Sequence, residues 1–379
     1  MRHCFCNNSR FEGRALPIVC GFTFFLAATC VFAQSGNEMA NLKWLYASEL
    51  TVEGKGWSDT KSFYDRLPAR AEKVVRPAVW NLSRDSTGMC VRFVTDSTTI
   101  AARWTLRKES LAMPHMPATG VSGLDLYVKE KGRWHWVANG RPLKKDEQKT
   151  LVKGLKPGRR EYLIYLPLYN GVEDVSVGVT TGAVFETASP RPGNVKPVVF
   201  YGTSITQGGC ASRPGMAYPA ILGRRLDCAT INLGFSGNAH SEPEMAKVLA
   251  ELDPSVFVLD PLPNMTPEMV GERLEKFIRA LRDARPATPI VLVENLEYRG
   301  ADFVPVRREK VAAANAKLKE AYTRLAEAGQ KKIFYVPMAK LLGDDTEATV
   351  DGSHPTDLGF MRMADAIEPT LRKAMKAAK

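Results

Sequence analysis

Four short segments of the chain carry the residue types that acyl transfer requires. They supply a serine, flexible glycines, an amide side chain and an Asp/His pair, and they are residues 202–208, 234–238, 260–264 and 351–355. A serine hydroxyl is a poor nucleophile until a neighbouring base takes its proton, and imidazole is a base suited to neutral pH. Asp351 precedes His354 by three residues, a spacing that allows the carboxylate to orient the ring. We therefore expect Ser204 to be the nucleophile, His354 the general base and Asp351 its orienting partner.

The tetrahedral intermediate of acyl transfer also needs hydrogen-bond donors for its negatively charged oxygen. The donors that we expect are the backbone N–H groups of Ser204 and Gly234 and the side-chain amide of Asn264. Each feature is weak alone, because Gly-x-Ser is frequent in loops and Asp-x-x-His is more often a helix cap beside a surface histidine. The prediction rests on the conjunction of all four segments.

Other polar residues near these segments allow two interpretations. His240 either lines the pocket or stands exposed before a helix. Four residues that follow a later candidate strand either contact substrate or support the fold, and they are Glu294, Glu297, Tyr298 and Arg299.

Common cofactor and metal motifs are missing from the sequence. It has no Gly-x-x-x-x-Gly-Lys-Ser/Thr loop and no Gly-x-Gly-x-x-Gly fingerprint. His-Glu-x-x-His is missing, and so is a paired Cys-x-x-Cys after residue 33, so we expect no cofactor and no metal. Thr206 stands where Gly-x-Ser-x-Gly would need its last glycine, which argues against the nucleophile elbow of α/β-hydrolases.

The second half of the chain alternates short apolar runs with helical patterns. The candidate strands are residues 197–202, 229–235, 256–260, 289–294 and 332–336. The candidate helices are residues 215–227, 242–252, 267–284, 306–328 and 357–376. This alternation predicts an α/β fold, a doubly wound three-layer sandwich around a five-stranded parallel sheet. The carboxyl ends of parallel strands share one edge, where ligands bind, so the four segments are expected to meet there.

The first half of the chain has the period-two pattern of antiparallel strands. Alternating runs recur at residues 91–94, 100–104, 124–128, 134–137, 162–166 and 175–179, which predicts a β-sandwich. All six tryptophans lie before residue 140, which suggests two separately built cores. The aromatic rings either bind sugar or simply fill a core. A Pro/Gly/Ser-rich stretch places the boundary between the halves at about residues 188–196.

Residues 1–33 have the pattern of a secretory signal peptide, with arginines, an apolar stretch and a small residue before the expected cleavage site. The alternative is a retained membrane anchor. Cleavage would leave Cys90, Cys210 and Cys228, and both a Cys210–Cys228 disulfide and buried free thiols stay open. We expect a periplasmic or secreted protein without a stable membrane span after cleavage.

The composition is that of an ordinary folded protein. Of 379 residues, 45% are hydrophobic and 25% charged, which excludes a disordered chain, a collagen-like repeat and a polytopic membrane protein. The net charge of +11 is spread along the chain without a basic stripe, so no nucleic-acid partner is expected.

The second half resembles the SGNH/GDSL hydrolase superfamily. The resemblance lies in Tyr-Gly-Thr-Ser-Ile-Thr around Ser204, Asn-Leu-Gly-Phe-Ser-Gly-Asn around Gly234, Leu-Pro-Asn-Met around Asn264 and Asp-Gly-Ser-His-Pro around His354. Residues 123–127, Gly-Leu-Asp-Leu-Tyr, resemble the Gly-x-Asp-Leu-Tyr signature of a β domain found upstream of such esterases. The resemblance implies a three-layer fold of flavodoxin type, ester hydrolysis and no metal. Two departures leave the substrate open: Gly-Thr-Ser replaces Gly-Asp-Ser, and Asn-Met replaces Asn-Asp.

These features together predict an exported serine esterase with a signal peptide (1–33), a β-sandwich domain (34–190) and a hydrolase domain (196–379). The expected substrates are small acyl esters, with acetyl groups on carbohydrate as the leading case. The alternatives are a lipase or thioesterase of the same superfamily, or a carbohydrate-binding surface protein that no longer has catalytic activity. The sequence leaves the oligomeric state open.

Overall fold

The computed structural model describes residues 39–192 and 195–378. The expected signal peptide, residues 1–33, lies outside the described residues. Within the described part of the chain, no helix is both long and apolar enough to cross a membrane.

A five-stranded parallel sheet organises the second half of the chain, as expected. Its strands are β11 (Val198–Gly202), β12 (Thr230–Gly234), β13 (Val256–Asp260), β14 (Ile290–Val293) and β15 (Ile333–Val336), in the order β12-β11-β13-β14-β15. Every residue of β11, β12 and β13 is buried, which explains why these strands are continuous apolar runs. Alternate residues of β11 enter opposite cores, Val199 and Tyr201 on one face and Val198 and Phe200 on the other.

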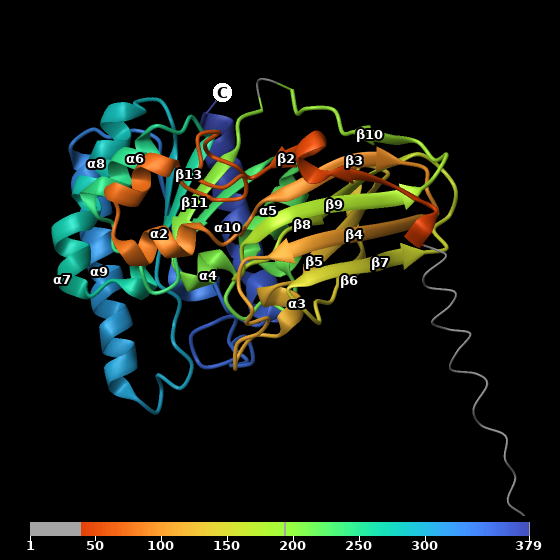
Figure 1. Ribbon diagram of the computed structural model, residues 1–379. Helices are drawn as coiled ribbons and strands as arrows, with labels where there is room; N and C mark the ends of the chain where they lie inside the picture. Colours follow the sequence, from red (N-terminus) through yellow and green to blue (C-terminus); the bar gives the residue numbers. More distant parts are fainter. Residues whose placement is uncertain (1–38, 193–194, 379) are drawn as a thin grey trace, which may run out of the picture. The chain divides into compact units, whose positions relative to one another are not determined.

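Helices cover both faces of this sheet and make three layers. One face carries α6 (Pro243–Ala250), α8 (Glu275–Ala284) and α9 (Pro305–Glu327), while the other carries α5 (Tyr218–Leu226) and α10 (Asp357–Ala377). Figure 1 shows the first group on the side of the sheet away from the β-rich part. The helix expected at 267–284 is divided into α7 (Pro267–Met269), a π-helical turn (Val270–Leu274) and α8.

The first half forms two antiparallel sheets that enclose a shared core. One sheet has the order β1-β9-β4-β7, formed by Leu42–Tyr46, Val172–Thr180, Thr99–Leu106 and Asp146–Lys153. The other has the order β10-β3-β8-β5-β6, formed by Phe185–Thr187, Cys90–Thr95, Arg160–Tyr165, Leu124–Glu130 and Arg133–Gly140, and β2 (Thr51–Glu53) pairs with β3. Five of the six predicted runs lie within these strands, and the run 162–166 extends one residue beyond β8. The polar sequence of β7 gave no signal because β7 is an edge strand with mixed burial.

The two β sheets and the parallel sheet have separate cores, as expected, but the tryptophans do not all belong to the first of them. Trp104 packs between the two β sheets. Trp80 instead lies on α2 (Pro77–Ser83) and packs into the core of the parallel sheet, on the face that also carries α6. The fully buried Arg66 makes a second connection between the early part of the chain and the parallel sheet. Its guanidinium donates to the carbonyl oxygens of Asn232 (3.0 Å) and Gly234 (2.8 Å) at the end of β12. The early segment of the chain therefore helps to build the edge of the sheet where ligands bind.

Candidate active site

Ser204 begins the short helix α4 (Ser204–Gln207) directly after β11. Thr203 caps this helix, because its hydroxyl oxygen accepts a hydrogen bond from Ile205 N–H at 3.2 Å. Gly202 permits the sharp turn from strand to helix, since a Cβ there would lie 2.0 Å from Thr206 Oγ1. The turn places the Ser204 side chain at the carboxyl end of the sheet.

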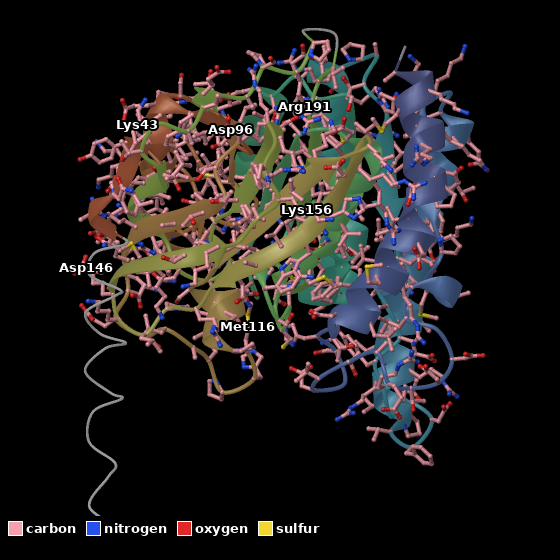
Figure 2. The ribbon with its side chains drawn as sticks, turned by 90° about the vertical axis from the view of Figure 1, so that its right-hand side faces the viewer. Lys43, Asp96, Met116, Asp146, Lys156 and Arg191 are labelled. Atoms are coloured by element: carbon pink, nitrogen blue, oxygen red, sulfur yellow. The ribbon has the colours of Figure 1, made fainter. Side chains whose placement is uncertain are left out.

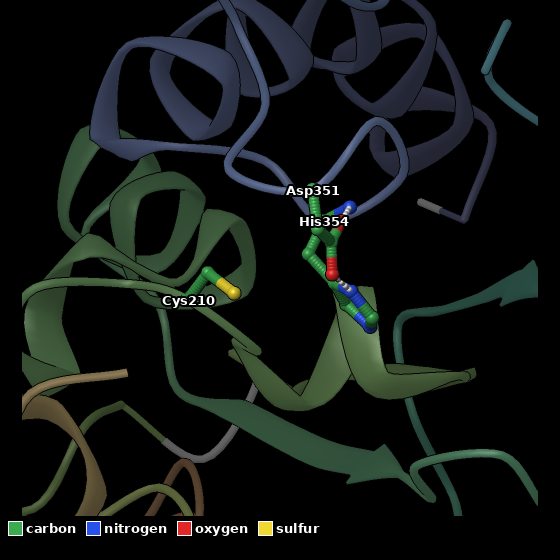
Figure 3. Close-up of side chains that lie close together, drawn as sticks. All are labelled: Cys210, Asp351 and His354. Atoms are coloured by element: carbon green, nitrogen blue, oxygen red, sulfur yellow. Dashed lines mark hydrogen bonds and ion pairs between the residues drawn. The ribbon is translucent and has the colours of Figure 1, made fainter. Parts of the chain in front are cut away.

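The structure brings Ser204, His354 and Asp351 together in one row of hydrogen bonds. Ser204 Oγ lies 2.8 Å from His354 Nε2, and His354 Nδ1 lies 2.7 Å from Asp351 Oδ2. Figure 3 shows the Asp351 carboxylate pointing at the imidazole of His354, both from the loop before α10. The imidazole therefore joins the serine hydroxyl to a carboxylate through its two nitrogens.

Asp351 is held as an anion. Its Oδ1 accepts hydrogen bonds from the N–H groups of His354 (2.8 Å) and Ser353 (3.0 Å) and from the Ser353 hydroxyl (3.1 Å). Burial raises the pKa of Asp351, but these hydrogen bonds and the His354 ring outweigh burial and hold the pKa well below its usual value. An anionic Asp351 keeps the ring proton on Nδ1 and leaves Nε2 to accept the proton of Ser204.

Gly234 does not offer its N–H to a ligand in this structure, contrary to the role expected for it. That N–H donates to Asn232 Oδ1 at 2.9 Å. A Cβ at Gly234 would lie 2.2 Å from the backbone nitrogen of Gln207, so the glycine allows β12 to approach α4 closely. The side-chain oxygen of Asn232, two residues earlier on β12, therefore occupies the N–H of Gly234. The role of Gly234 is to allow close packing of β12 against α4.

The side-chain amide of Asn264 keeps its donor group free within the described part of the chain. Its Oδ1 accepts a hydrogen bond from Ala239 N–H at 3.3 Å, while its Nδ2 group has no partner among the described residues. The turn after β12 adds a further candidate, Gly237, which has φ +68°. Ser236 N–H donates to Gln207 Oε1 at 3.0 Å, so this turn is held against α4. The sequence did not predict Gly237 as a candidate donor. Residue type alone does not distinguish its N–H from that of Gly234, because the backbone conformation of the turn decides which N–H groups are already hydrogen-bonded.

Two residues of the β-rich part also reach the site, and the sequence did not identify either of them as a site residue. The Tyr169 hydroxyl donates to the backbone oxygen of Ser204 at 3.2 Å. The ring of His115 lies beside that of His354, with centroids 5.8 Å apart and planes at 47°. Gly209 fits between these groups, because a Cβ there would lie 2.9 Å from Tyr169 Oη and 3.1 Å from His354 Cδ2. No local pattern could place these distant segments together.

The Gly-x-Asp-Leu-Tyr segment connects the β-rich part to the loop after α4. The buried carboxylate of Asp125 accepts hydrogen bonds from Arg213 Nη1 and Gly215 N–H, each at 2.8 Å, and from Trp136 Nε1 at 2.8 Å. In the same loop, Ser212 N–H donates to the side chain of Asp357 at 3.0 Å, at the start of α10 and three residues after His354. Asp125 thus supports the loop between α4 and α5, which also contacts the start of α10.

The weaker candidates mostly support neighbouring segments. Glu294 accepts hydrogen bonds from Tyr335 Oη and, at 2.6 Å, from Met338 N–H, so it braces the sheet. Arg299 N–H donates to Gly352 O at 2.7 Å and supports the loop of Asp351. The remaining three make contacts near the same edge: Tyr298 with Pro263, Glu297 with Arg299 and His240 with Gly237.

Cys210 lies close to the catalytic row (Figure 3), and among the described residues it completes a group with Asp351 and His354 whose ligand atoms lie within 4.8 Å of one another. Burial and the charge of Asp351 raise the pKa of the Cys210 thiol to about 12, so it stays protonated. The facing atoms of Asp351 and His354 are already hydrogen-bonded to each other. These three side chains therefore suit the hydrogen-bonded arrangement of Ser204, His354 and Asp351 better than they suit coordination of a metal ion. Cys90, Cys210 and Cys228 are all buried free thiols, so Cys210 and Cys228 do not form a disulfide in this structure.

Comparison with known proteins identifies the family. Residues 195–372 match the GDSL-like Lipase/Acylhydrolase family, and residues 42–185 match the family described as the N-terminus of Esterase SGNH hydro-type. A crystal structure described as a GDSL-like lipase from Bacteroides ovatus ATCC 8483 is 35% identical, with a TM-score of 0.84, over 89% of this chain and 98% of that one. The chain belongs to the GDSL-like lipase/acylhydrolase family. Membership of this family implies that the chain is a serine hydrolase and that its substrates are esters.

More distant structures share the fold of this GDSL-like protein. A salicylyl-acyltransferase from a tetracycline biosynthetic pathway is 20% identical with a TM-score of 0.68, over 88% of this chain and 97% of that one. A family two carbohydrate esterase from Cellvibrio japonicus is 14% identical with a TM-score of 0.60, over 89% of this chain and 99% of that one. An acetyl xylan esterase from Butyrivibrio proteoclasticus is 13% identical with a TM-score of 0.55, over 89% of this chain and 100% of that one. None of the curated proteins compared with the chain matches it.

Proposed function

We propose that this chain is an exported serine esterase that removes small acyl groups, above all acetyl, from carbohydrate through an acyl-enzyme. One observation carries the proposal: the hydrogen-bonded row from Ser204 Oγ through His354 to Asp351. A buried serine beside a histidine whose other nitrogen faces a carboxylate is the arrangement that activates a hydroxyl.

Acylation follows from this geometry. His354 Nε2 takes the proton of Ser204 as Oγ forms a bond to the ester carbon, and the carbonyl electrons move to the oxygen. Asn264 Nδ2 and the N–H groups of Ser204 and Gly237 donate to that oxygen, with Gly237 taking the place first expected for Gly234. The intermediate collapses, the carbon–oxygen bond to the alcohol breaks, and His354 passes its proton to the departing oxygen.

Deacylation repeats these steps with water. His354 takes a proton from a water molecule whose oxygen attacks the ester carbon of the acyl-serine. The bond to Ser204 Oγ breaks, the serine recovers its proton from His354, and a carboxylic acid leaves. Asp351 stays anionic and stabilises the imidazolium formed in both halves of the cycle.

Two observations support acetylated carbohydrate over other esters. The fold is shared with two proteins described as carbohydrate esterases, one of them an acetyl xylan esterase. Residues 1–33 have the pattern of an export signal, which would place the enzyme where extracellular or periplasmic glycans are found.

The proposal is tested by a panel of substrates for the protein that begins after residue 33. Acetylated polysaccharides, p-nitrophenyl esters of increasing acyl length and an acyl thioester are compared by kcat/KM. We expect acetate release from the polysaccharides and a steep loss of rate beyond short acyl chains. A maximum at long chains or with the thioester would favour the lipase or thioesterase alternative. No turnover of any ester, with retained binding of polysaccharide, would favour the binding protein.

A further inference from the structure

His115 belongs to the β-rich part of the chain but lies at the catalytic histidine. Its ring is 5.8 Å from the ring of His354, measured between centroids. The residue is exposed, and its ring nitrogens have no hydrogen-bond partner among the described residues. An imidazole with free nitrogens is therefore available to a molecule bound at Ser204.

The turn that carries His115 is fixed against the α/β part of the chain. Met113 and Met116 exchange two backbone hydrogen bonds of 3.0 Å across the turn. Met116 is 2% exposed and packs in the same core as Ala211, which belongs to the loop after α4. Figure 2 shows Met116 at the lower end of the β sheets. Nearby, Thr119 Oγ1 donates to Ser212 O at 2.6 Å, so the turn and the loop are joined on both sides.

The chemistry of acylation decides which part of the substrate His115 meets. His354 must pass its proton to the departing oxygen, so the alcohol portion has to lie beside the imidazole of His354. In the proposed mechanism the acyl oxygen faces Asn264 instead, which lies in the turn directly after β13 at the carboxyl end of the sheet. His115 lies next to the His354 ring, and it therefore stands on the alcohol side.

We propose that His115 forms an alcohol subsite with His354 and hydrogen-bonds a hydroxyl group next to the ester in a polyhydroxy alcohol, that is, a sugar. A neutral imidazole carries one donor and one acceptor, which matches a hydroxyl group. The alkyl group of a simple alcohol or a thiol would gain nothing from it. The proposal rests on the proposed esterase function. It means that the β-rich part contacts the substrate directly and helps to select it.

The experiment compares two substrates that share an acetyl group and differ in their alcohol. An acetylated xylo-oligosaccharide offers neighbouring hydroxyls, whereas p-nitrophenyl acetate has none and leaves without needing a proton. We expect His115→Ala to lower kcat/KM for the oligosaccharide by about tenfold, the value of one hydrogen bond, mainly through KM. The rate with p-nitrophenyl acetate is expected to change by less than about twofold. His115→Gln keeps a donor and an acceptor and is expected to recover part of the loss.

His135→Ala is the matched control, because His135 is an exposed histidine of the same β-rich part on β6. It is expected to leave both substrates unchanged. A second measurement avoids turnover: calorimetric binding of the acetylated oligosaccharide to Ser204→Ala is expected to weaken about tenfold in Ser204→Ala/His115→Ala.

Equal losses on both substrates, or no loss on either, would overturn the alcohol subsite while leaving the esterase function standing. If the unaltered protein hydrolyses neither substrate, the esterase function itself fails. The two proposals can therefore be judged separately.

Discussion

The Tyr169 hydroxyl, from the β-rich part of the chain, donates a hydrogen bond to the backbone oxygen of Ser204 at 3.2 Å. The side chain enters the site beside Gly209, and burial raises the pKa of Tyr169, so the hydroxyl stays a donor at any working pH. The nucleophile helix α4 is thus held from both halves of the chain. Through this contact the β-rich segment supports the backbone of the residue that we propose as the nucleophile.

Removing that hydroxyl gives the first prediction. Tyr169→Phe is expected to lower kcat by about 3- to 10-fold, because one hydrogen bond that orients Ser204 is lost while the ring stays in place. KM and the melting temperature should change little. Steady-state kinetics with p-nitrophenyl acetate and a thermal melt check this, and an unchanged kcat would show that the contact does not orient the serine.

The amide of Asn264 gives the second prediction. Asn264→Ala is expected to lower kcat by roughly 10²–10³ with little effect on KM, since an oxyanion donor acts in the transition state. Asn264→Asp tests the same point with a side chain of equal size that cannot donate when ionised. An unchanged kcat in Asn264→Ala would return the residue to a structural role, in which it only holds Ala239.

The space around Gly209 gives the third prediction. A Cβ would lie 2.9 Å from Tyr169 Oη, which is closer than real Cβ atoms come, and 3.1 Å from His354 Cδ2. Gly209→Ala is therefore expected to displace a catalytic group and lower kcat by roughly 10- to 100-fold. Gly271→Ala is the control, because the nearest atom there is a lysine side-chain carbon at 3.7 Å. Similar kinetics for both variants would contradict the tight packing at Ser204.

The buried carboxyl of Asp260 gives the fourth prediction, which concerns pH. Burial raises the pKa of Asp260 to about 7, although hydrogen bonds from the hydroxyls of Tyr218 and Thr206 oppose the shift. The folded pKa exceeds the unfolded value, so the folded protein keeps this proton longer than the unfolded chain does. Its contribution to stability is full below the unfolded pKa and is lost as pH rises towards the folded pKa of about 7.

Asp260→Asn removes this titration. Urea unfolding at pH 5 and pH 8 is expected to show a smaller loss of the free energy of unfolding with rising pH in the variant than in the unaltered protein. A parallel pH dependence in both proteins would show that Asp260 does not titrate in this range.

The sequence predicted the parallel sheet closely, because strands buried on both faces are continuous apolar runs bounded by polar loops. Val256–Asp260 is a strand with the predicted bounds, and the other four strands begin and end within one residue of them. The row of Ser204, His354 and Asp351 was foreseeable for a related reason: all three follow from residue type and from the edge at which the carboxyl ends of strands meet.

The remaining features depend on contacts that no local pattern contains. Gly234 N–H is satisfied by Asn232 Oδ1, and only the packed structure reveals which donor at a strand end is already used. Trp80 belongs by sequence to the β-rich half but packs on the parallel sheet, because α2 crosses to that face. His115 and Tyr169 reach the site from loops of the β-rich part whose positions are set by distant packing.

The central claim is that Ser204 attacks the ester, and the hydrolysis rate of p-nitrophenyl acetate tests it most directly. The protein beginning after residue 33 and its Ser204→Ala variant are compared at equal concentration, with a thermal melt to show that both are folded. The account predicts steady release of p-nitrophenol by the unaltered protein and a rate in Ser204→Ala that falls by at least about 10³, as for other nucleophile deletions in serine hydrolases. Equal rates in the two proteins would contradict it.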